Sequence, residues 1–331
     1  MRVLVVKMSS LGDVVHTLPA LTDAARSLPG ISFDWVVEEA FAEMPGWHSA
    51  VATVIPVALR RWRKHPLKNF RGPEWQQARK ALSAERYDAV IDAQGLVKSA
   101  FIASRVSAPR YGMDRKSVRE RLAILAYHHK IAVPKNLHAV ERTRLLFARA
   151  LNYELPNTRG DYGIRDGLIG SAQPPAPTLL FFHGTARAEK LWPQSHWRDL
   201  LEQAFAAGYK VWLPWASEQE RERAQRIAQD SAGAEVLPRL NIEGLADRLL
   251  QVQAVVAVDT GLGHLSAALD VPTVSLYGPT STRLVGAYGK NQVHIQSPVG
   301  VGATRDPAIM MASISAAAVW NELRAILARR E

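Results

Sequence analysis

Residues 254–280, AVVAVDTGLGHLSAALDVPTVSLYGPT, decide the fold of this 331-residue chain. An apolar run ends at Asp259, a short helical pattern carrying His264 follows, and a second apolar run, Thr273–Leu276, ends at a Tyr-Gly-Pro-Thr turn. This order predicts a strand, a polar turn, a helix and a parallel strand. In open α/β sheets ligands bind at the carboxyl ends of the strands, and helix N-termini there bind anions. We therefore predict a site for a phosphorylated ligand at this edge.

Strands and helices alternate along two stretches of the chain, which predicts the α/β class with parallel sheets. Each stretch begins with an apolar strand that runs into a polar turn, and we expect two facing Rossmann-like domains with a cleft between them. The expected parts are an N-terminal domain over 1–160, a Pro- and Gly-rich linker over 161–178, a C-terminal domain over 179–312, and a helix over 313–331 that packs back on the N-terminal domain.

Hydrophobic periodicity sets the expected bounds of the elements. Strands are expected at Val3–Val6, Phe33–Val37, Val51–Val57, Ala89–Asp92, Arg110–Gly112, Leu179–Phe182, Lys210–Leu213, Glu235–Leu237 and in the opening segment. Helices are expected at Val14–Ser27, Glu74–Ala84, Val97–Arg105, Ala139–Leu151, Ser195–Ala207, Glu218–Gln229, Ile242–Leu250 and Ser313–Arg329.

Charge is distributed unevenly along the chain. Residues 1–170 hold 26 Lys and Arg against 16 Asp and Glu, whereas residues 171–331 hold 15 of each kind. A one-sided field steers anionic partners to the first half, and nucleic acid, a membrane surface and an acidic substrate all fit it. With no cysteine in the chain, disulfides, thiolate metal sites and a cysteine nucleophile are excluded.

The chain shows no secretory signal and no membrane span in its hydropathy. The first apolar run is interrupted at Lys7, which is too early for a signal peptide. No run approaches the roughly 18 apolar residues of a spanning helix. We expect a cytoplasmic protein.

Asp13 and a basic segment are the candidate groups of the first half. Asp13 follows Ser-Ser-Leu-Gly after the first strand, and either stabilises the next helix from its first turn or acts as a general base. Residues 60–68, RRWRKHPLK, carry five cations and no acid, and form either a solvated loop or a clamp for phosphates or carboxylates. In the clamp alternative, Trp62 would lie against a sugar or an acyl chain. Further basic stretches lie at 115–121 and 127–130, but aromatic residues are too sparse for a nucleic-acid platform.

In the second half, His183–Pro193 offers a strand end followed by Gly-Thr and by Lys190, which is either a phosphate ligand or a surface lysine. The glycine spacing of a Walker A loop is missing. Trp192 and Trp197 fit the start of the next helix better than a binding site. His264 is either a phosphate ligand or a core histidine. No His-Glu-x-x-His, Asp-x-Asp or tight acid cluster is present, so we expect no metal site.

Four motifs together resemble glycosyltransferase family 9, the heptosyltransferases, over about the whole chain. They are KMSSLGDVVHTLP at 7–19, DAQGLVKS at 92–99, HAVER at 138–142 and DTGLGHL at 259–265. The resemblance implies a GT-B fold and an inverting, metal-independent transferase without a cofactor. The implied donor is ADP-L-glycero-D-manno-heptose, and the implied acceptor is a Kdo sugar of Kdo-lipid A, which receives the first heptose of the lipopolysaccharide inner core. It also implies a monomer at the cytoplasmic face of the inner membrane.

The resemblance assigns roles to individual residues, with Asp13 as the catalytic base. Implied donor-binding residues are Thr185, Lys190, Glu220, Leu240, Asp259, Thr260, Gly261 and His264. The expected acceptor-binding residues are Lys7, Ser10, Arg60, Arg61, Arg63, Lys64, Lys98, Arg119 and Arg121. Two positions depart from the family pattern: Ala186 replaces a second threonine, and Gly263 stands where serine is common. We expect these departures to tune donor affinity, and we expect Asp259 to fix backbone N–H groups or a sugar hydroxyl.

Other functions fit parts of the pattern. A GT-B-like sugar-nucleotide epimerase would turn over its substrate without an acceptor. A basic binder of nucleic acid or of membranes would show steep salt dependence and no affinity for ADP. Within the family, a transferase that adds the second heptose is the nearest alternative.

Overall fold

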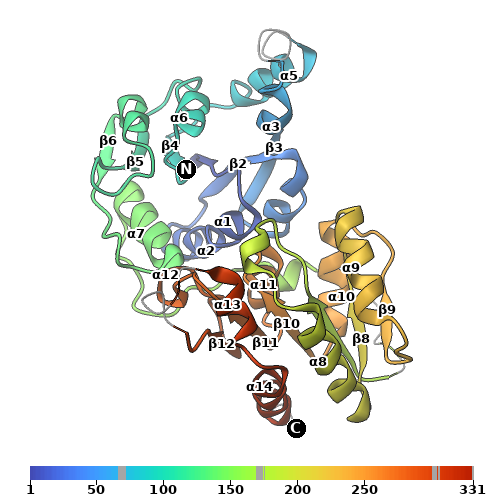
Figure 1. Cartoon of the computed structure of the whole chain (residues 1–331). Helices are drawn as coiled ribbons and strands as arrows, with labels where there is room; N and C mark the ends of the chain where they lie inside the picture. Colours follow the sequence, from blue (N-terminus) through green and yellow to red (C-terminus); the bar gives the residue numbers. More distant parts are fainter. Residues whose placement is uncertain (66–71, 169–173, 175, 300–303, 305, 330–331) are drawn as a thin grey trace. The chain divides into compact units, whose positions relative to one another are not determined.

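The chain forms two compact units, Met1–Gly167 and Leu168–Glu331. The computed structural model describes all residues except 66–71, 169–173, 175, 300–303, 305 and 330–331 (Figure 1). Parts of the predicted basic segment (66–68), linker (169–173 and 175) and C-terminal helix (330–331) therefore lie outside the described residues. The boundary between the units falls inside the predicted linker. Tyr162 and Ile164 are buried, so the beginning of that stretch is packed as part of the first unit.

The described strands of the first unit form one parallel sheet. They are β1 (Arg2–Val6), β2 (Ser32–Glu38), β3 (Val51–Val57), β4 (Ala89–Asp92), β5 (Arg110–Met113) and β6 (His129–Ile131). Their order is β3-β2-β1-β4-β5-β6, which is the doubly wound order. Val3–Val6 are fully buried, because helices cover both faces of a parallel sheet. The strand β6 was not predicted.

Helices flank this sheet: α1 (Leu11–Val15), α2 (Leu18–Ser27), α3 (Leu59–Trp62), α5 (Pro73–Leu82), α6 (Val97–Ala103) and α7 (Ala139–Leu151), with the 3₁₀ helices η1 (Glu39–Phe41), η2 (Met44–Trp47), η3 (Arg121–Ala126) and η4 (Arg165–Gly167). Leu4 packs in a cluster with Trp75 of α5, and Phe33 contacts Phe147 of α7 at 6.2 Å between ring centroids. The helix predicted at Val14–Ser27 is two helices. The second one carries Pro19 in its first turn, where a missing N–H costs nothing.

The second unit repeats the same topology. Its described strands are β7 (Thr178–Phe182), β8 (Lys210–Leu213), β9 (Ala234–Val236), β10 (Ala254–Val258), β11 (Thr273–Tyr277) and β12 (Gln292–Gln296). The order β12-β11-β10-β7-β8-β9 is again doubly wound, and every pairing is parallel. The expected α/β class with two Rossmann-like sheets is confirmed.

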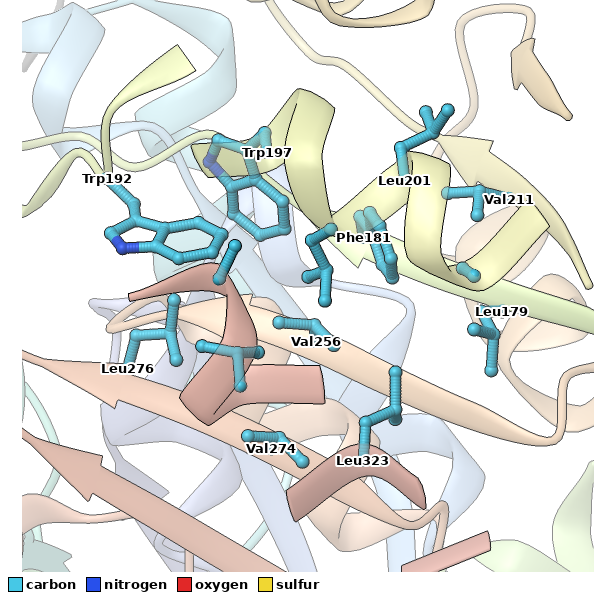
Figure 2. Packing of buried hydrophobic residues seen from close by; sticks show 14 of the residues in the cluster. Leu179, Phe181, Trp192, Trp197, Leu201, Val211, Val256, Val274, Leu276 and Leu323 are labelled. Atoms are coloured by element: carbon cyan, nitrogen blue, oxygen red, sulfur yellow. The ribbon is translucent and has the colours of Figure 1, made fainter. Parts of the chain in front are cut away.

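The helices of the second unit are α8 (Gln194–Ala206), α9 (Glu218–Ala228), α10 (Ile242–Gln251), α11 (Gly261–Ala268), α12 (Thr282–Val285), α13 (Pro307–Ala312) and α14 (Ala316–Ala328), with the 3₁₀ helix η5 (Ala188–Lys190). Figure 2 shows Trp192, Trp197 and Phe181 packed together over the sheet. Both tryptophans are fully buried, and they lie just before α8 and in its first turn, where the sequence predicted the start of a helix.

The C-terminal helix packs on the sheet of the second unit, whereas the sequence predicted that it packs back on the N-terminal domain. Val319, Leu323 and Ile326 of α14 lie in the core cluster formed by β7, β10, β11 and α8, and Figure 2 shows Leu323 beside Val274. Their spacing of four and three residues forms one helical face. That face is already buried against this sheet.

Candidate active site

The first cluster of candidate residues lies at the switch point of the first sheet. The strands β1 and β4 are neighbours there, and their connections leave the sheet toward opposite faces. Lys7–Ser10 follows β1, and Ala93–Leu96 follows β4. The two loops are therefore placed side by side at the carboxyl edge of the sheet.

Asp13 lies in the first turn of α1, and both of its carboxylate oxygens are engaged. Its Oδ2 accepts the Ser10 N–H at 3.1 Å, which is the helix-capping role considered from the sequence. Its Oδ1 accepts Arg119 Nη2 at 2.7 Å and lies 3.7 Å from Lys7 Nζ. The carboxylate thus caps its helix and also forms the centre of a cationic cluster.

The cations decide the ionisation of Asp13. Burial alone would raise the pKa of Asp13, but Lys7 and Arg119 outweigh burial and hold this pKa well below its usual range. Burial lowers the pKa of Lys7, and Asp13 opposes that shift. The carboxylate is therefore charged at neutral pH, as a proton acceptor must be. Lys7 is buried and faces Asp13, so its action is on that carboxylate.

Gln94 joins the two loops of this cluster. Its Oε1 accepts the Met8 N–H at 2.7 Å, and its Nε2 donates to Ser9 Oγ at 3.3 Å. Lys7 Nζ in turn donates to the Ala93 carbonyl at 3.0 Å. These bonds tie the segment before Asp13 to the end of β4. Gln94 belongs to a motif quoted above, but sequence analysis gave it no role.

Asp92 anchors the second loop from inside the protein. Its buried carboxylate accepts the Tyr127 hydroxyl at 2.6 Å, Ser99 Oγ at 2.8 Å, and the N–H groups of Gln94 and Gly95 at 2.9 and 3.0 Å. Burial raises the pKa of Asp92, while these four donors oppose the shift. The network fixes the loop on which Gln94 stands.

The basic segment contributes fewer unpaired cations than its sequence indicates. Arg61 forms ion pairs with Glu39 and Glu74, each at 3.0 Å. Trp62 is buried and donates from Nε1 to Glu74 at 2.7 Å, which corrects the expectation that it contacts a sugar or an acyl chain. The edge-to-face contact of Trp62 with Trp75 places it in the core.

The remaining predicted acceptor residues of the first unit are Lys98, Arg60, Arg63, Lys64 and Arg121. Burial lowers the pKa of Lys98, and the charges of Arg60 and Arg63 lower it further against Glu38. Lys98 also reaches Ser9 Oγ at 3.5 Å. Lys64 and Arg121 are exposed. The charges of Arg60 and Arg63 therefore act on Lys98.

The second cluster lies at the switch point of the second sheet, where β10 and β7 are neighbours. Lys190, at the end of η5, forms an ion pair of 2.6 Å between its Nζ and Asp259 Oδ2. Thr185 donates from its hydroxyl to the Asp259 carbonyl at 3.2 Å. Asp259 therefore holds the ammonium of Lys190, a role that sequence analysis did not assign to it. The two residues are 69 positions apart, and no spacing rule links them.

The other predicted donor residues follow neighbouring strands of the same edge. Glu220, in the first turn of α9, accepts the Ala216 N–H at 2.8 Å. A Cβ on Gly184 would lie 2.5 Å from Glu220 Oε1, so a larger residue after β7 would require this carboxylate to move. Leu240 is half-buried in the loop between β9 and α10.

The last three predicted donor residues lie at or near the N-terminus of α11. Thr260 is its N-cap and Gly261 its first residue, directly after β10. His264 is buried in the same helix. This helix begins directly at the end of β10, and a helix N-terminus at that edge favours an anion.

The described part of the chain contains no group of three or more His, Asp and Glu residues that could hold a metal ion. In the same residues, no helix combines the length and the apolar character that crossing a membrane requires.

Two doubly wound sheets of identical order, each with a polar cluster at its switch point, are the architecture of the GT-B fold class. The sequence profile of glycosyltransferase family 9 (heptosyltransferase) matches residues 75–309, and the chain belongs to this family.

Two relatives, one of them with two solved structures, describe the likeness in detail. The lipopolysaccharide heptosyltransferase 1 of Pseudomonas aeruginosa is 56% identical over 298 residues, which cover 90% of this chain and 84% of that protein. The structure of the E. coli heptosyltransferase WaaC with ADP superposes with a TM-score of 0.91 at 47% identity, covering 98% of this chain and 100% of WaaC. WaaC with ADP-2-deoxy-2-fluoro heptose gives a TM-score of 0.87 at 46% identity, covering 98% and 99%.

Proposed function

We propose that this chain transfers L-glycero-D-manno-heptose from ADP-heptose to a Kdo sugar of Kdo-lipid A, in synthesis of the lipopolysaccharide inner core. The observation that carries the proposal is the identity to a lipopolysaccharide heptosyltransferase 1 at more than half of the aligned positions over nine tenths of the chain. The E. coli structures with ADP and with a fluorinated ADP-heptose support the same donor here.

The proposed reaction is a single in-line displacement with inversion. The acceptor hydroxyl oxygen forms a bond to the anomeric carbon of the heptose, and Asp13 takes the hydroxyl proton. The bond from that carbon to ADP breaks, and its electron pair leaves with the diphosphate. Lys190, Thr185 and the N-terminus of α11 stabilise the charge that develops there.

The cationic cluster of the first unit would bind the acceptor. Kdo carries a carboxylate and lipid A carries phosphates, and arginine makes two parallel hydrogen bonds to either group. Arg60, Arg63, Lys98 and Arg119 are the candidates for these contacts. We place the working enzyme at the cytoplasmic face of the inner membrane, as a monomer that needs neither metal nor cofactor.

The test is an ADP-release assay with ADP-heptose, run with and without deacylated Kdo-lipid A and repeated in EDTA. We expect release only with the acceptor, at the same rate in EDTA. Release without the acceptor would indicate an epimerase or a hydrolase. Strict dependence on metal would contradict the role given to Lys190. Turnover only with an acceptor that already carries one heptose would reassign the chain to the second transfer.

A further inference from the structure

Two exposed leucines follow shortly after Arg119, the residue that forms an ion pair with Asp13. Leu122 and Leu125 are 69% and 81% exposed, and both belong to η3. Residues three apart eclipse each other in a 3₁₀ helix, so the two side chains share one face. We name this face, formed by Leu122 and Leu125, the leucine ridge.

The leucine ridge projects from a fixed element. On the inner side of η3, Ala123 and Tyr127 are buried in a cluster with Ala100 of α6. The Tyr127 hydroxyl is bound to Asp92, and a Cβ on Gly112 would collide with the Tyr127 ring. The exposure of the leucines is therefore a property of packed structure rather than of a frayed end.

Cations flank the leucine ridge in the sequence. Residues 114–130 contain five Lys and Arg against two Asp and Glu. Arg121 is the first residue of η3 and is exposed. A third apolar side chain, Val97, is 47% exposed, and its N–H donates to Glu120, the acid beside Arg121, at 2.7 Å. Apolar side chains among cations match an anionic membrane surface, where leucines enter the acyl boundary and cations meet the headgroups.

We propose that the leucine ridge docks on an anionic lipid bilayer, with Leu122 and Leu125 inserted at the acyl boundary. A stable protein interface buries about 800 Å² on each partner, which three exposed apolar side chains do not supply. A bilayer requires only a few such side chains together with cations.

The proposed function gives a reason why a membrane-docking face would lie here. In this one point the docking proposal rests on the proposed function. Arg119, two residues before η3 begins, is paired with Asp13 at 2.7 Å. A lipid-linked acceptor whose sugar reaches Asp13 would keep its lipid near the leucine ridge. Docking there would let the sugar react while the acyl chains stay in the bilayer.

The first experiment is flotation of the full chain with vesicles of phosphatidylcholine containing about one third phosphatidylglycerol. We expect Leu122→Ser/Leu125→Ser to lower the partition coefficient about tenfold or more, and added salt to weaken binding of the wild type. The matched control is Ile309→Ser, which changes a 52% exposed side chain of the second unit and should bind like the wild type. Unchanged flotation of the double variant would overturn the proposal. So would a dimer of the wild type that the double variant loses, since the occupant would then be a second copy.

The second experiment separates docking from catalysis. With deacylated Kdo-lipid A in solution, the double variant should turn over like the wild type. With the acylated acceptor in the same vesicles, its kcat/KM should fall about tenfold. If the double variant matched the wild type on both acceptors, the docking proposal would be overturned. Absence of transfer by the wild type on either acceptor would contradict the proposed function and leave the flotation result to decide the docking.

Discussion

The two switch points contain the same pair of residue types in opposite arrangements. In the first unit Asp13 is the more exposed partner, at 18%, and Lys7 is the more buried one, at 6%. In the second unit Lys190 is the more exposed partner, at 16%, and Asp259 the more buried one, at 8%. One sheet therefore presents a carboxylate supported by an ammonium, and the other presents an ammonium supported by a carboxylate.

This difference shows how one topology supports two chemistries. The doubly wound order fixes where a ligand binds, and the side chains on the loops decide what the site does. A presented carboxylate suits the acceptor hydroxyl, because it takes a proton. A presented ammonium suits the diphosphate, because it neutralises negative charge. In both sites the more buried partner forms an ion pair with the more exposed group.

The largest effect is expected from Asp13→Asn, which keeps the shape of the side chain and removes its charge. We expect kcat to fall by about 10²-fold or more, because the acceptor hydroxyl loses its base. ADP release with deacylated Kdo-lipid A measures this, and thermal unfolding checks that the variant is folded. Near-normal turnover by a folded variant would show that Asp13 is not the base. The contrast between the two switch points would then no longer hold.

Arg119→Gln should give the next largest effect. The acceptor KM should rise about tenfold, because a charge-assisted contact is lost. Arg119 also lowers the pKa of Asp13, so its removal raises that pKa. The acid limb of kcat/KM should then move to higher pH, since this ratio reports ionisation of the free enzyme. Arg115→Gln, at an exposed arginine of the same unit, is the control. An unmoved acid limb would show that Arg119 does not tune the base.

Each unit also contains a buried histidine with a depressed pKa. Burial lowers the pKa of His48 and of His183 to about 4, and the cations Arg26 and Arg223 add to the respective shifts. The folded protein binds these protons less readily than the unfolded chain does. Stability is therefore full above pH 6.5 and falls as the pH drops toward 4, by about 1.4 kcal/mol per pH unit for each histidine.

Urea unfolding at several pH values between these limits measures that slope. His48 accepts the Ala50 N–H on Nδ1, so its Nε2 carries the proton shared with Thr22 at 2.9 Å. His48→Asn should remove the contribution of one proton, about 1.4 kcal/mol per pH unit, from the pH dependence of the unfolding free energy. A slope identical to that of the wild type would mean that His48 is not responsible for the acid sensitivity.

The smallest effect is expected from Gln94→Ala. Without the bonds to Met8 and Ser9, the segment before Asp13 loosens, and kcat should fall a few-fold while the Kd for ADP stays unchanged. Gln251 is a buried glutamine of the second unit that donates to Asp247 at 2.8 Å. Gln251→Ala is therefore a matched control for lost stability. Equal kcat values for the two variants would reduce Gln94 to a structural role.

Hydrophobic periodicity predicts much of the fold, and the two strands that it misses are missed for the same reason. The bounds of β3, β4, β8 and α7 agree with the sequence prediction, because their apolar patterns begin and end sharply. The missed strands β6 and β12 lie at sheet edges, and β6, with the sequence HKI, has no fully buried side chain. An edge strand needs no continuous apolar run, so its sequence resembles a loop.

The candidate site divides in the same way. Asp13, Lys190 and Asp259 follow directly from motifs at strand ends. Their partners do not, because Asp13 with Arg119 and Lys190 with Asp259 are joined only by tertiary structure. Trp62 was misassigned because a basic neighbourhood concealed its packing against Trp75. Sequence spacing locates the site, whereas packing decides which charges are available to a ligand.

The central claim is that the two presented groups serve different substrates. Titration calorimetry of ADP with the wild type, Asp13→Asn, Lys190→Met and Asp259→Asn tests it most directly. We predict an unchanged Kd for Asp13→Asn, a Kd at least about tenfold higher for Lys190→Met, and an intermediate increase for Asp259→Asn, which leaves Lys190 unsupported. ADP affinity that depends on Asp13 and not on Lys190 would contradict the account.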